Sequence, residues 1–67
     1  MPGRSELELS KAIQECAHLC SGHADPSACV REYCERLIRL HDWSTPDAHA
    51  VEESTLHVID RLRDICF

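Results

Sequence analysis

The sequence has little of what turns and membrane segments require. Only two of its 67 residues are glycine and three are proline, and aromatic residues make up 4% of the chain. Glycine and proline supply many of the turns between short strands, so their scarcity disfavours a turn-rich β fold. No apolar run exceeds a few residues, which predicts neither a membrane-spanning helix nor a signal peptide. We therefore expect a cytoplasmic protein with no membrane partner.

Basic residues are also few. Seven lysines and arginines stand against twelve acidic residues, which gives a formal net charge of −5. Nucleic-acid binding needs a concentrated basic surface to displace counterions from phosphates, so we expect no nucleic-acid partner. An acidic surface instead suits a basic surface on a protein partner.

The motifs of common enzymes are missing as well. The chain contains no glycine-rich phosphate loop, H-E-x-x-H pair or G-x-S-x-G nucleophile turn. Cys34 and His41 lie seven residues apart, on one face of a helix, but a five-cysteine, five-histidine chain produces such pairs by chance. We expect no enzymatic activity, no catalytic residue and no bound cofactor.

What the sequence does contain is helical periodicity. Three start signals divide the chain, namely the capping pair Ser5 and Glu8 and the dipeptides Asp25-Pro26 and Thr45-Pro46. Apolar residues follow each signal at steps of three and four. We predict one all-α domain over residues 1–67, with helices at 6–20, 26–42 and 46–66. The first two helices are expected to form an antiparallel hairpin, and Gly22 to end the first in the left-handed conformation.

Four cysteines and two histidines fall within residues 16–34, and three interpretations of them are open. Cys16, Cys20, His23 and Cys34 could bind zinc or copper, although their spacing lacks the C-x2-C unit of common zinc motifs. Disulfides could join Cys20 to Cys29 and Cys16 to Cys34, and would fasten the hairpin. The favoured interpretation makes Cys16, Cys20 and Cys34 small core residues, because free cysteine is among the most buried residue types.

The third helix carries more apolar surface than one core stripe needs. Its heptad stripe comprises Ala48, Val51, Thr55, Val58, Leu62 and Ile65, and a second stripe of Leu56, Ile59 and Cys66 runs beside it. A 67-residue domain is only marginally stable alone, so the wide apolar arc indicates either a second chain as partner or a helix that wraps further into its own core. We predict a homodimer and a small regulator or inhibitor that binds another protein. The predicted interface residues are Trp43, Leu56, Ile59, Arg63 and Phe67.

Overall fold

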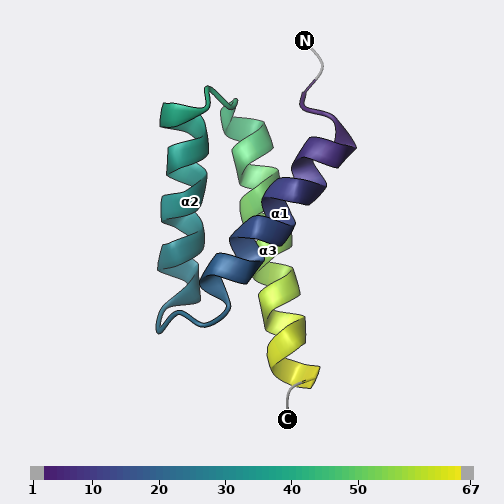
Figure 1. Ribbon diagram of the computed structural model, residues 1–67, viewed down its shortest axis with the longest axis vertical. Helices are drawn as coiled ribbons and strands as arrows, with labels where there is room; N and C mark the ends of the chain where they lie inside the picture. Colours follow the sequence, from purple (N-terminus) through teal and green to yellow (C-terminus); the bar gives the residue numbers. More distant parts are fainter. Residues whose placement is uncertain (1–2, 66–67) are drawn as a thin grey trace.

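Three helices make up the fold, in the arrangement that Figure 1 shows. The computed structural model describes residues 3–65, with side chains described as far as Arg63. Helix α1 spans Glu6–Cys20, α2 spans Pro26–Leu40 and α3 spans Thr45–Ile65, and the described residues contain no strand. The predicted all-α, three-helix fold is therefore confirmed. Within the same residues, no helix combines the length and the apolar character that crossing a membrane would require.

Helix α3 is the element on which the other two pack. Helix α2 runs beside it, while α1 crosses it obliquely, and α1 and α2 touch each other less than either touches α3. The two helices come closest at the loop that joins them and diverge from there (Figure 1). The predicted hairpin is thus a splayed pair, with α3 filling the space between its arms.

Polar side chains fix the starts of α1 and α2. The Ser5 hydroxyl accepts a hydrogen bond from the Glu8 amide at 3.3 Å, and the Asp25 carboxylate accepts one from the Ala28 amide at 3.3 Å. Each acceptor satisfies an amide that has no partner inside its helix. The carboxylate of Glu8 bonds Arg4 at 2.8 Å instead of returning to Ser5, so only half of the predicted capping box is present.

Three predicted details of the helix ends are wrong. Helix α2 ends two residues earlier than predicted, because Asp42 has a φ of 59° and turns the chain out of the helical direction. Helix α3 begins at Thr45, and the preceding Ser44 caps it by accepting the Asp47 amide at 3.4 Å. Gly22 does not have positive φ, so the chain leaves α1 without a left-handed glycine. Position 66, the predicted end of the third helix, lies outside the described residues.

The core lies where the three helices meet, and its side chains are small. Its buried apolar residues are Ala12, Cys16, Ala17, Cys20, Val30, Cys34, Leu37, Ala48, Val51 and Ile59. Three cysteines and three alanines among them let the helix backbones approach closely. The resulting core offers little apolar volume, so cross-links and surface clasps contribute more to stability than in a larger domain.

One such clasp closes the end of the molecule that holds the α2–α3 turn. The Arg4 guanidinium carbon lies 4.6 Å from the centroid of the Trp43 ring, and its Nη2 donates to the His41 carbonyl at 3.1 Å. The Arg4 amide also donates to the Asp47 carboxylate at 3.2 Å. These contacts join the start of α1 to the turn between α2 and α3. Trp43 is consequently half-buried between the core and this clasp.

Candidate functional site: a groove between α2 and α3

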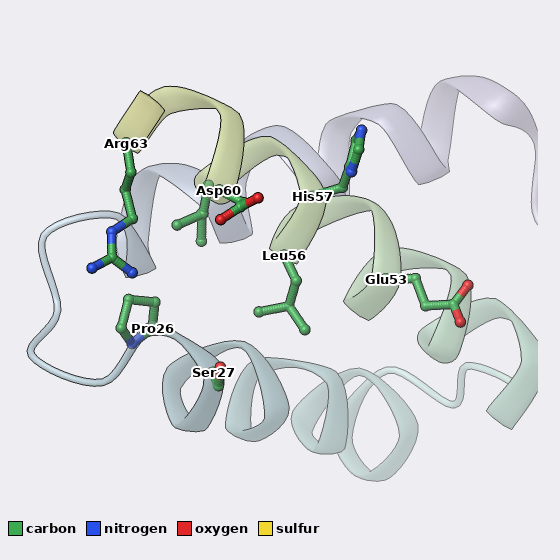
Figure 2. Close-up of a pocket in the computed structure, with 8 residues that line it drawn as sticks. Pro26, Ser27, Glu53, Leu56, His57, Asp60 and Arg63 are labelled. Carbon is green, nitrogen blue, oxygen red and sulfur yellow. The ribbon is translucent and has the colours of Figure 1, made fainter. Parts of the chain in front are cut away.

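The candidate site is an open groove of about 500 Å³ between the start of α2 and the second half of α3. Figure 2 shows Leu56 pointing from α3 towards α2, with Arg63 near Pro26 at one end and Glu53 at the other. Proline at the first position of α2 has no backbone N–H, which a helix does not need at that position, and its ring provides part of the groove wall. The groove therefore has an apolar floor and charged ends.

The five predicted interface residues do not form one surface. Leu56, Ile59 and Arg63 line the groove together. Ile59, however, is only 4% exposed and belongs to the chain's own core. Trp43 lies outside the groove, beneath Arg4, and Phe67 lies outside the described residues. Three residues of the predicted set are thus brought together, and two of these, Leu56 and Arg63, have side chains that another chain could contact.

Charges of both signs surround the groove. Glu53 and Asp60 are acidic, Arg63 is basic, and His57 is exposed beside them. Sequence reasoning missed Pro26, Ser27, Glu53 and Asp60, because their place in the groove depends on how α2 lies against α3. The i,i+3 and i,i+4 spacing of residues 53, 56, 60 and 63 was the available signal, since these positions share one helix face.

A second apolar surface lies on α3 beside the α1 crossing. Val58 and Leu62 belong to the stripe predicted to face the core, yet they are 37% and 44% exposed. The buried stripe instead runs through Val51, Thr55 and Ile59 at steps of four. Helix α3 extends past the loop that joins α1 and α2, so the end of its core-facing side has no helix over it (Figure 1).

The four cysteines among the described residues form one disulfide and two buried thiols. Cys20 is bonded to Cys29 across the α1–α2 loop, while Cys16 and Cys34 are thiols. The favoured interpretation is therefore wrong for Cys20, which is buried but cross-linked, and the second predicted bridge is not formed. The proposed metal-ligand set is not assembled either, because Cys20 is in the bridge. Residues 3–63 hold no group of three histidine, cysteine or acidic side chains placed to bind a metal.

The two thiols lie in the core and are unreactive there. Burial is the main cause that raises the pKa of Cys34 to about 12, and the neighbouring Cys16 and Glu52 raise it further. Burial also raises the pKa of Cys16, partly offset by the nearby Thr55 hydroxyl. Only the thiolate is a strong nucleophile, so Cys34 is protonated and inert at neutral pH. His41, its suggested catalytic partner, caps α2 at the surface.

Thr55 is the buried polar residue beside these thiols, and it is fully buried. Its Oγ1 has no hydrogen-bond partner of good geometry among the described residues, and the nearby Cys16 sulfur, to which the hydroxyl could donate, is only a weak acceptor. Replacing Thr55 by valine keeps the shape and removes the unsatisfied hydroxyl. We expect Thr55→Val to raise the free energy of unfolding by about 1 kcal/mol, measured by urea denaturation.

The matched control is Val51→Thr, one helical turn earlier and equally buried. It introduces a hydroxyl of the same shape and should destabilise the protein by about the same amount. If Thr55→Val lowers the free energy of unfolding by as much as Val51→Thr does, the Thr55 hydroxyl has a partner in solution and the expectation is wrong.

Comparison with known proteins gives no further assignment. No family model matches the chain, and no curated protein or solved structure shows a significant match to it. The proposed function therefore depends on the geometry and charge of the groove.

Proposed function

We propose that the protein is a small, acidic interaction module that binds another protein chain through the α2–α3 groove. Its role is that of a regulator or inhibitor in the cytoplasm, and it acts by binding, not by catalysis. The observation that carries the proposal is the groove itself, where half-buried Leu56 lies between Glu53, Asp60 and Arg63. An apolar anchor with a charged rim is the usual composition of a helix-binding surface.

The same groove supports self-association. A two-fold dimer brings one patch against itself, so the patch must be complementary to itself. Glu53 and Arg63 stand at opposite ends of the groove (Figure 2), and an antiparallel second copy would place each against the other. We propose a homodimer held by Leu56 and these two ion pairs. A target protein with an apolar helix flanked by basic residues would compete for the same surface.

The test is photo-crosslinking from position 56, with position 40 as the matched control. Leu40 is also a helical leucine and is 73% exposed, but it lies at the end of α2 away from the groove. A photoreactive residue at 56 should give specific products, and the same residue at 40 should not. The mass of each product distinguishes two copies of this chain from a complex with a target protein.

Charge reversal tests the proposed pairing. We expect Arg63→Glu to weaken dimerisation about tenfold by sedimentation, since it places two acidic groups together, and Glu53→Arg combined with Arg63→Glu to restore it. If the wild type is monomeric at all accessible concentrations and position 56 gives no more product than position 40, the groove is not a binding surface.

A second candidate function has one observation in its favour. The Cys20–Cys29 bridge makes the α1–α2 pair a disulfide-fastened helical hairpin, which was the alternative interpretation of the cysteine stretch. In that case residues 16–34 would carry the function and α3 would serve as scaffold. If a photoreactive residue at position 19, beside the bridge, gives specific products and one at position 56 does not, this alternative is favoured.

A further inference from the structure

The disulfide lies at a second hollow, at the closed end of the splayed hairpin. This hollow has a volume of about 240 Å³ and is bordered by both bridge residues and by His23, Glu32 and Arg36. A water molecule occupies about 30 Å³ in the liquid, so the hollow has room for a small organic molecule. The bridge therefore borders a hollow on one side, where Cys29 is half-buried, and its other residue, Cys20, lies in the core.

The two sulfur-bearing residues differ in their exposure. Cys20 ends α1 and is 0% exposed, whereas Cys29 lies in the first turn of α2 and is only half-buried. Thiol–disulfide exchange depends on which sulfur an incoming thiolate can reach. A helix N-terminus favours a thiolate at Cys29, which would make Cys29 the better leaving group. Access outweighs this preference here, because the fully buried Cys20 offers no line of approach.

We propose that Cys29 is a thiol-exchange site at which a small-molecule thiol forms a mixed disulfide in the folded protein. The incoming thiolate attacks the Cys29 sulfur, the bond to Cys20 breaks, and Cys20 leaves as a thiolate that takes a proton from water. A second thiolate then attacks the bound thiol's sulfur and releases Cys29 as a thiolate. The bridge is thereby reduced by two electrons, and two molecules of the small thiol are oxidised to their disulfide.

The two buried core thiols do not interfere with this reaction. Cys16 and Cys34 are buried thiols, and burial raises the pKa of each, so neither supplies a thiolate that would attack the bridge from inside. The hollow at Cys29 shares no lining residue with the groove, so exchange there holds or fails independently of the proposed function.

The experiment uses the oxidised wild type with free cysteine as the probe thiol. Samples are quenched in acid, blocked with a maleimide in denaturant, and mapped by mass spectrometry. We expect a transient adduct of one cysteine on Cys29, with Cys20 as the newly blocked thiol. The rate should stay constant across urea concentrations below the unfolding transition, because exchange in the folded state needs no global opening.

A rate that rises exponentially with urea would show that exchange passes through the unfolded chain, and an adduct on Cys20 would place the attack at the wrong sulfur. Either result overturns the proposal. A matched pair of variants gives an independent measurement, because Cys20→Ser and Cys29→Ser both lose the bridge. With cystine as the oxidant, Cys29 in Cys20→Ser should react at least tenfold faster than Cys20 in Cys29→Ser. Equal reaction rates for these two variants in the absence of urea would also overturn the proposal.

Discussion

Removing the Cys20–Cys29 bridge is expected to lower the free energy of unfolding by about 2.5 kcal/mol, from the chain entropy of the loop it closes. The two cysteines are nine residues apart in the sequence. Folded proteins have a free energy of unfolding of roughly 0.05–0.15 kcal/mol per residue. For 67 residues, a loss of this size is a large part of the total free energy of unfolding. The measurement is urea denaturation of the oxidised wild type and of Cys20→Ser combined with Cys29→Ser.

The control for this prediction is the reductant. Wild type that has been fully reduced should lose about as much stability as the double variant, and the variant itself should be unaffected by reductant. Thermal unfolding should shift downward by about 10–20 °C, since 1 kcal/mol corresponds to about 4–8 °C in a domain of this size. Identical denaturation curves with and without reductant would show that the bridge does not constrain the chain in solution.

Truncating Ile59 is expected to cost about 3 kcal/mol, within the range observed for buried isoleucine replaced by alanine. Ile59 is 4% exposed, and its side chain packs in the core that all three helices share. Leu56 lies one turn away in the groove and is half-buried. Leu56→Ala should therefore cost less than half as much. Urea denaturation of the two variants measures the difference directly.

Comparing Leu56→Ala with Ile59→Ala distinguishes an effect on stability from an effect on binding. Leu56→Ala should affect self-association more than folding, whereas Ile59→Ala should affect folding first, so Ile59 variants are poor tests of an interface. If the two variants lose equal stability, Leu56 is as well buried as Ile59 and the groove is closed in solution.

The helices could be predicted because their signals are local. Ser5 and Asp25 are side-chain caps that act on amides three residues away, and sequence alone identifies them. The errors at the end of α2 and at the start of α3 have a different origin. Asp42 adopts a left-handed conformation, which is uncommon for residues other than glycine, and Ser44 competes with Thr45 as a cap. Which of two adjacent hydroxyl residues caps a helix depends on how the preceding loop approaches it.

The candidate site could be predicted only in part. Apolar periodicity in the third helix indicates Leu56 and Ile59, but it does not reveal where a neighbouring helix covers their face. In the structure Val58 and Leu62 are exposed, and Ile59 is buried instead. The Cys20–Cys29 pairing was among the predicted alternatives, but a sequence does not show which cysteines lie within bonding distance. Arg4 gave no periodic signal, because it precedes α1 and acts through Trp43.

The Arg4 clasp also holds the N-terminal end of the described chain at one end of the molecule. Gly3 lies against Asp47 beside the α2–α3 turn, whereas α3 runs to Ile65 at the opposite end (Figure 1). The molecule measures 42 Å along this axis and only 20 and 14 Å across it. Two labels or domains attached beyond these ends would be held apart by a rod about one helix length long. The described fold therefore places its two ends at opposite poles of an elongated molecule.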